Sequence, residues 1–120
     1  MRVHVRTLAI CLASLLLLSL LSVVPALAGQ KGSSRQTFTG VVSDSMCGAK
    51  HMMPGDAVGC AHACLKQGSK YALVVGDKVY TLETSDKSAT DVLDKLVGQK
   101  ARISGTVNGD TIRVSSVSGA

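Results

Sequence analysis

Four side chains have the types and the spacing of a metal site. Three residues separate Cys47 from His51, and three separate Cys60 from Cys64. Residues four apart lie on one face of a helical turn, so each pair can present two ligands together. Thiolate and imidazole are the usual ligands of tetrahedral zinc, and three cysteines with one histidine form a common structural set. The spacing therefore predicts a zinc-type site at Cys47, His51, Cys60 and Cys64.

A disulfide is the alternative use of the same cysteines, because exported proteins are commonly oxidised. The sequence has four cysteines, of which Cys11 lies in an N-terminal segment that we expect to be removed. The three that remain cannot all pair within one chain, so one bridge leaves a free thiol. Cys60 and Cys64 lie near the limit of allowed separation on a helix, so a bridge would join Cys47 to one of them. The leftover thiol could then serve in extracytoplasmic thiol-redox chemistry.

Further soft donors lie in the same stretch. Met46, Met52 and Met53 flank the first cysteine and histidine, and His62 lies between Cys60 and Cys64. Thioether, thiolate and imidazole together suit copper(I). A methionine more often fills packing gaps, and His62 falls on the opposite helical face from the two cysteines. Copper is therefore the second choice after zinc.

Catalysis is less well supported than binding. The C-x3-C motif matches neither the C-x-x-C of thioredoxins nor the C-x-x-C-H of c-type haem attachment. Cys47 or Cys64 could pair with His51, but no third group is evident to orient such a pair, although Asp44 and Asp56 could be proposed. The sequence contains no Gly-rich phosphate loop and no H-E-x-x-H motif. We therefore assign no catalytic residue and favour a non-enzymatic role.

The N-terminus has the pattern of a secretory signal peptide. Arg2 and Arg6 form a positive region, residues 8–24 are almost continuously apolar, and Ala26-Leu27-Ala28 supplies an A-x-A cleavage site. We expect residues 1–28 to be removed, so that the mature chain is exported to the periplasm or secreted. An uncleaved segment would instead be a single membrane anchor, since its length just reaches the lower bound for a spanning helix.

The charge of the mature chain does not indicate a nucleic-acid partner. Loss of Arg2 and Arg6 lowers the formal charge from +5 to +3, and the remaining lysines are scattered among aspartates. Export also separates the chain from intracellular nucleic acid. The sequence identifies no other partner and no oligomeric state.

The order of the expected elements follows from local patterns. Residues 29–36 are small and polar and should form a flexible lead-in to one domain over 37–118. Alternating and β-branched residues predict strands over 37–43, 70–76, 78–83, 100–107 and 111–117. The spacing of apolar residues predicts helices over 57–65 and 89–97, with Asp56 and Ser88 as their N-caps. Gly40, inside the first strand, predicts a bulge or bend.

This order predicts a mainly β protein with two short helices. Five short strands with a helix between the third and fourth is the layout of an OB-fold, a small five-stranded barrel. The Cys- and His-bearing loop and helix, residues 44–68, would be an insertion between the first two strands. A plain five-stranded α+β sandwich is the alternative. A mature domain of about 90 residues has a modest core, so a covalent or metal staple would help to stabilise it.

The chain also resembles a family of small exported bacterial proteins, described as domains of unknown function with an OB-like barrel. The resemblance covers nearly the whole mature chain and implies an exported OB-like module, but it carries no activity. It rests on these motifs: Asp44-Ser45-Met46-Cys47-Gly48-Ala49-Lys50-His51, Cys60-x3-Cys64-Leu65-Lys66-x-Gly68, Tyr71-Ala72-Leu73-Val74 and Val79-Tyr80-x-Leu82.

Overall fold

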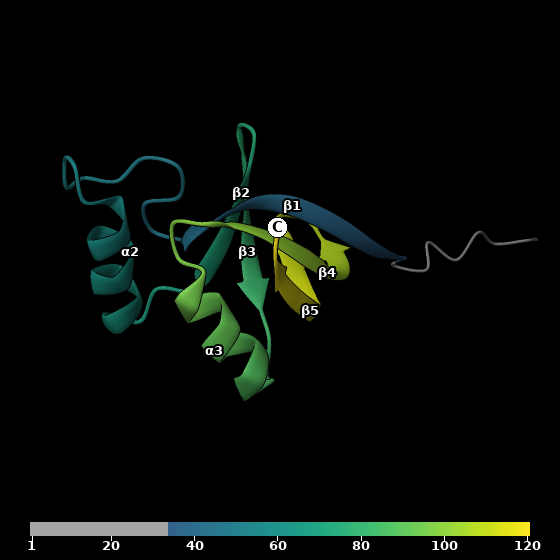
Figure 1. Cartoon of the computed structure of the whole chain (residues 1–120). Coiled ribbons are helices and arrows are strands. Elements are labelled where there is room, and N and C mark those ends of the chain that lie inside the picture. The colour runs from purple at the N-terminus through teal and green to yellow at the C-terminus, as the bar shows by residue number, and fades with distance from the viewer. Residues whose placement is uncertain (1–33) are drawn as a thin grey trace, which may run out of the picture. The chain divides into compact units, whose positions relative to one another are not determined.

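Five strands and two helices make up the part of the chain that the computed structural model describes, residues 34–120 (Figure 1). The expected signal peptide, 1–28, lies outside these residues. The prediction of a mainly β protein with two helices is confirmed. In chain order the elements are β1 (Arg35–Asp44), α2 (Ala57–Lys66), β2 (Tyr71–Val75), β3 (Lys78–Glu83), α3 (Lys87–Lys95), β4 (Lys100–Asn108) and β5 (Thr111–Gly119).

The strands pair in a closed order, β1-β2-β3-β5-β4 and back to β1. All pairs are antiparallel except β3 with β5, which run parallel. The ring is uneven, because β3 and β5 pair only from Thr81 to Glu83, whereas β4 and β5 pair along nearly their whole length. The register between β4 and β5 shifts after Ser104, where Ser115 of β5 has no partner in β4, the pattern of a β-bulge.

β1 pairs with both β4 and β2, and Gly40 lies near the point where the pairing passes from β4 to β2. Residues 35–41 pair with β4, and residues 41–44 pair with β2. A Cβ at Gly40 would overlap the backbone carbonyl of Val74, so only glycine allows this approach. The expected irregularity at Gly40 is thus a close contact between backbones. β1 begins at Arg35, inside the predicted lead-in, because Arg35 and Gln36 pair with β4.

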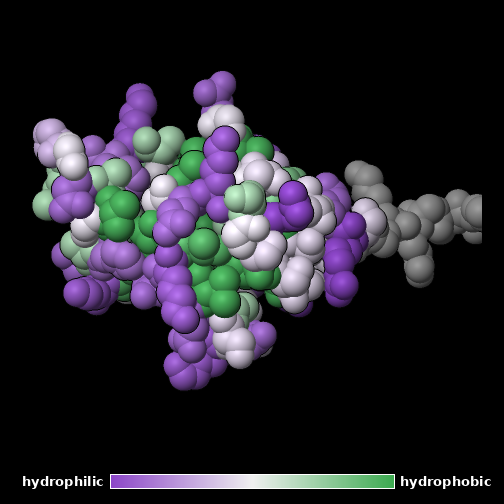
Figure 2. Space-filling model, in the orientation of Figure 1, coloured by the Kyte–Doolittle hydropathy of each residue, from purple (hydrophilic) through white to green (hydrophobic). Residues whose placement is uncertain are grey.

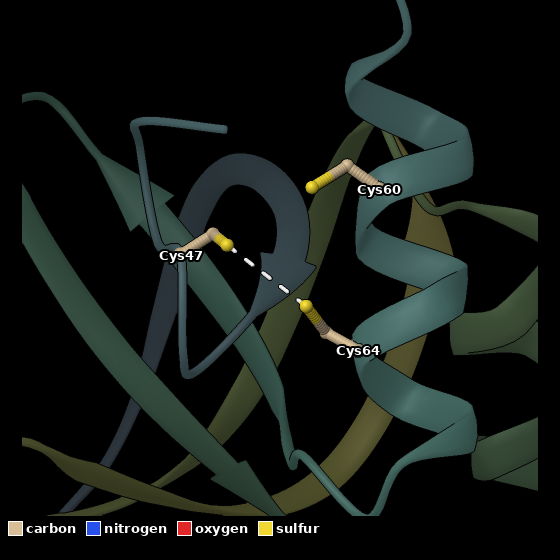
Figure 3. A group of neighbouring side chains, drawn as sticks. All are labelled: Cys47, Cys60 and Cys64. Carbon is tan, nitrogen blue, oxygen red and sulfur yellow. Dashed lines mark hydrogen bonds between the residues drawn. The ribbon is translucent and has the colours of Figure 1, made fainter. Parts of the chain in front are cut away.

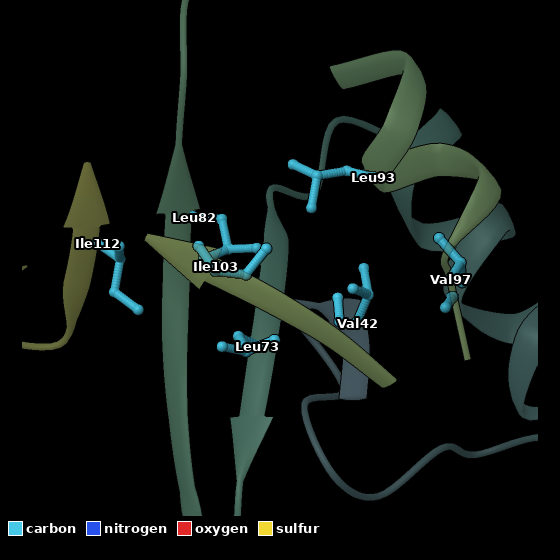
Figure 4. Close-up of a cluster of buried hydrophobic side chains, with 9 residues drawn as sticks. Val42, Leu73, Leu82, Leu93, Val97, Ile103 and Ile112 are labelled. Atoms are coloured by element: carbon cyan, nitrogen blue, oxygen red, sulfur yellow. The ribbon is translucent and has the colours of Figure 1, made fainter. Parts of the chain in front are cut away.

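Alternate residues of the strands point inward and form an apolar core together with α3 (Figure 4). Burial of each such side chain contributes about 1.5–3 kcal/mol. α3 begins at Lys87, two residues before the predicted start, because the Asp86 carboxylate accepts a hydrogen bond from the backbone N–H of Ser88. The labelled members of this core are Val42, Leu73, Leu82, Leu93, Val97, Ile103 and Ile112.

The segment between β1 and β2, residues 45–70, lies beside the barrel and contains α2 (Figure 1). We call it the insertion. The large hydrophobic side chains that are exposed in the described residues all belong to it: Met46, Met52, Met53 and Val58. Hydrophobic surface shows both in the centre of the view in Figure 2 and toward the end where α2 lies. The insertion is therefore covered less completely than the barrel.

Candidate metal centre

The end of β1 positions Cys47 through a buried carboxylate. The Asp44 side chain is 0% exposed, and its Oδ1 accepts hydrogen bonds from the backbone N–H groups of Met46 and Cys47, each 2.9 Å long. The turn continues at Gly48, whose φ of +59° favours glycine. The backbone N–H of Gly48 donates to the carbonyl oxygen of Asp44. Asp44 thus fixes the turn that carries the first thiol.

α2 positions the other two thiols. The Asp56 carboxylate caps the helix by accepting a 2.8 Å hydrogen bond from the N–H of Gly59. Cys60 is 5% exposed and Cys64 lies one turn later on the same face. His62 is on another face, where its Nδ1 lies 3.5 Å from Asp94 Oδ1 beside α3. The prediction that His62 points away from the cysteines is confirmed.

The three thiols meet between the turn and the helix (Figure 3). Their sulfur atoms all lie within 4.8 Å of one another, and the Sγ atoms of Cys47 and Cys64 are 3.9 Å apart. Two thiolates on one tetrahedral zinc, each about 2.3 Å from the ion, are about 3.8 Å apart. Sulfur atoms in a disulfide are about 2.0 Å apart. All three cysteines are free in this part of the chain, with a spacing that suits a shared ion.

A second group of possible ligands adjoins the first and shares Cys47 with it. One ligand atom each from Asp44, Cys47 and His51 lie within 4.8 Å of one another. The His51 side chain is 16% exposed, and its Nδ1 lies 3.9 Å from Asp44 Oδ2. Both of these atoms are buried and lack a hydrogen-bond partner among residues 34–120. Buried polar atoms without partners are rare and call for an explanation.

The structure brings three of the four predicted ligands together and places the fourth, His51, in the second group. Asp44 is the residue that sequence reasoning undervalued, since we considered it only as an orienting group for a catalytic pair. Its position directly before the Cys47 turn was the available signal. The local sequence does not reveal that the carboxylate is buried beside His51.

The electrostatics of the site oppose a free thiolate. Burial, the hydrogen bond with Cys47 and the negative charge of Asp44 together raise the pKa of the Cys64 thiol from 9.0 to about 11. Without a cation, Cys64 is therefore protonated at neutral pH. A metal ion must displace this proton, and the ion's positive charge offsets the same negative surroundings. The arrangement suits metal binding better than nucleophilic attack.

Comparison with protein-family models, with curated proteins and with solved structures finds no match for this chain. Among residues 34–120, none of the helices has both the length and the apolar character needed to cross a membrane. The geometry of the site is therefore the basis for assigning a function.

Proposed function

We propose that the protein is an exported metal-binding module that holds a zinc-type ion through the thiolates of Cys47, Cys60 and Cys64. The observation that carries this proposal is the meeting of three free sulfur atoms from two separate elements. With its thiolates joined by an ion, α2 is tied to the end of β1. The role is structural or ligand-binding, and no catalytic residue is assigned.

We also propose that the scaffold is an OB-like barrel. The closed strand order and the helix between β3 and β4 support this assignment. Export and membership of the family of small exported proteins belong to the same proposal, and they rest on the sequence patterns of residues 1–28 and 44–82. The sequence spacing of Cys47, His51, Cys60 and Cys64 predicts a four-ligand version of the site, which requires His51 to approach the thiols of α2.

The exposed methionines favour copper(I) as the second candidate ion. Met46 and Met52 are 68% and 87% exposed, which is unusual for large apolar side chains. Both flank the turn that carries Cys47 and His51. Thioether sulfur binds copper(I) and not hard cations, so these side chains could pass a soft ion to the thiols.

The competing function is thiol redox chemistry. Cys47 and Cys64 form the shortest sulfur contact, so oxidation would join them and leave the buried thiol of Cys60. The raised pKa of Cys64 weighs against this function, because a protonated thiol is a poor nucleophile.

Metal analysis of the purified protein, with matched variants of α2, tests the proposal. We expect at least one equivalent of zinc and, after exchange for cobalt(II), the intense near-ultraviolet absorption of thiolate ligands. Cys64→Ser should weaken this absorption, whereas His62→Ala, on another face of the same helix, should keep it in full. Protein without metal, in which two cysteines resist alkylation until they are reduced, would instead establish the disulfide.

A further inference from the structure

We propose a second cation site formed by Asp44, His51 and Cys47, which adjoins the three-thiolate site and shares the sulfur of Cys47. The proposal rests on the proposed function, since it adds an ion to the same centre. The second ion is a divalent metal of the zinc class, bound by one oxygen, one nitrogen and one sulfur atom.

The hydrogen bonds of Ser43 indicate which ring nitrogen of His51 carries the proton. The Ser43 hydroxyl donates its hydrogen to the carbonyl oxygen of Gly48 over 2.7 Å. Its oxygen is then free to accept from His51 Nε2, 3.3 Å away. A neutral imidazole that donates from Nε2 has a bare lone pair on Nδ1. Asp44 Oδ2, which is also a hydrogen-bond acceptor, lies 3.9 Å from Nδ1. Both atoms are buried, and neither has a hydrogen-bond donor within residues 34–120.

The separation of these two atoms fits an ion better than a hydrogen bond. At 3.9 Å, Nδ1 of His51 and Oδ2 of Asp44 are too far apart for a direct hydrogen bond. Zinc binds nitrogen at about 2.0–2.1 Å and carboxylate oxygen at about 2.0–2.2 Å, so one ion between them reaches both. Tetrahedral geometry would place the two atoms about 3.4 Å apart, so ion binding would draw them together by about 0.5 Å.

Charge balance also favours two ions. Three thiolates and the Asp44 carboxylate carry four negative charges when all are ionised. One divalent ion leaves half of this charge uncompensated beside a buried carboxylate, whereas two divalent ions neutralise it. Because uncompensated buried charge is costly, the second ion stabilises the first. Cys47 is the bridge, since its sulfur belongs to both groups.

A cavity adjoins the His51 side of the second site. Ser43 and His51 line this cavity of about 280 Å³, whose remaining walls come mainly from β1, the turn at residues 48–49 and the first half of α2. The cavity is large enough for a hydrated ion to approach the imidazole and shed its water there. We expect the second ion to enter from this cavity and not past the three thiols.

Native mass spectrometry of the reduced, purified protein titrated with zinc counts the ions directly. We expect two ions per chain in the natural protein and one in Asp44→Asn and His51→Gln. Cys60→Ser and Cys64→Ser should each keep the second ion and weaken the first at least tenfold. Cys47→Ser should weaken both, and His62→Gln should still bind two. Asn at 44 keeps an oxygen acceptor for the turn, and circular dichroism checks the fold of each variant.

The outcomes separate this proposal from the proposed function. One ion that Cys64→Ser removes, but that Asp44→Asn and His51→Gln leave unchanged, would overturn the second site and retain the thiolate site. One ion that both His51→Gln and Cys64→Ser remove would also overturn it, in favour of a single Cys3His site. A chain that binds no zinc would overturn both proposals.

Discussion

The barrel and the insertion are held together by different kinds of interaction. Leu73, Ile103 and Ile112 in the barrel are fully buried among other apolar side chains. In the contiguous apolar core of the described residues, Ala61 is the one buried residue from the insertion, and Leu65 packs against it partly buried. The insertion instead relies on the Asp44 carboxylate, on helix capping and on three thiols.

This difference indicates where an ion should matter. Apolar burial does not depend on metal, so the barrel should keep its fold when the ion is removed. The insertion has few buried apolar contacts, and metal binding should supply much of its local stability. Four comparisons test whether the stability of the barrel and that of the insertion change independently.

The largest effect should come from the barrel core. Ile103→Ala removes a fully buried side chain and should lower the free energy of unfolding by about 2–5 kcal/mol. Met52→Ala in the insertion, where the side chain is 87% exposed, should change it by less than about 0.5 kcal/mol. Urea denaturation with and without a chelator measures both. If the cost of Ile103→Ala depended strongly on metal, the two regions would not be separate.

The next largest effect should come from Gly40, near the point where β1 stops pairing with β4 and begins to pair with β2. Gly40→Ala forces a methyl group against the carbonyl of Val74 and should cost about 1–3 kcal/mol. The exposed neighbour Thr39→Ala is the control, with a smaller expected loss. Thermal unfolding of the two variants compares them. Equal losses would show that β1 and β2 can separate at this point without cost.

The two helix caps form a matched pair across the regions. Asp86→Ala removes the cap of α3, which packs on the barrel, and should lower the free energy of global unfolding by about 1 kcal/mol. Asp56→Ala removes the equivalent cap of α2. Its cost should fall mainly on the metal affinity, which should drop about fivefold. Hydrogen exchange of α2 and a zinc titration measure the second effect, and equal global losses would contradict the distinction.

The smallest effect should appear at high pH in the metal-free protein. The Cys64 thiol ionises near pH 9 when unfolded and near 11 when folded, so raising the pH favours the unfolded state between these values. Burial and the hydrogen bond to Asp94 raise the pKa of Tyr71 in β2 from 10 to about 12, which extends the loss. Stability should therefore be complete below pH 9 and decline above it.

Two variants assign this decline to the two regions. Cys64→Ser should remove the part that begins at pH 9, and Tyr71→Phe should remove the part that begins at pH 10. Urea denaturation at several pH values provides the measurement. A decline that neither variant alters would show that other groups are responsible.

The elements were predictable because their signals are local. The alternation in β4, the Asp56 cap and the spacing of Cys60 and Cys64 all act within a few residues, and each matches the structure. The start of α3 differed because Asp86 competes successfully with Ser88 for the capping position. Local patterns indicate which residues can cap a helix or pair in a sheet. They do not indicate which of two possible capping residues the helix uses.

The second ligand group could not be predicted in the same way. Its defining feature is that Asp44 Oδ2 and His51 Nδ1 are buried together without a donor. This depends on Ser43 occupying Nε2 of His51 and on the barrel covering Asp44. Both are consequences of tertiary packing, whereas the three thiols follow from spacing and one turn.

The sequence separations of two side-chain contacts predict which contact forms first during folding. Cys47 and Cys64 are 17 residues apart, whereas Thr37 of β1 and Ser104 of β4, which hydrogen-bond to each other, are 67 apart. Closing the longer segment costs about 1 kcal/mol more in chain entropy, and β1 has no partner on that side until β4 has been synthesised. The three sulfur atoms can therefore meet while the ring of strands is still open. Metal binding and disulfide formation then compete kinetically at the thiols of a partly folded chain. Whichever is faster determines whether the thiols bind an ion or form a disulfide.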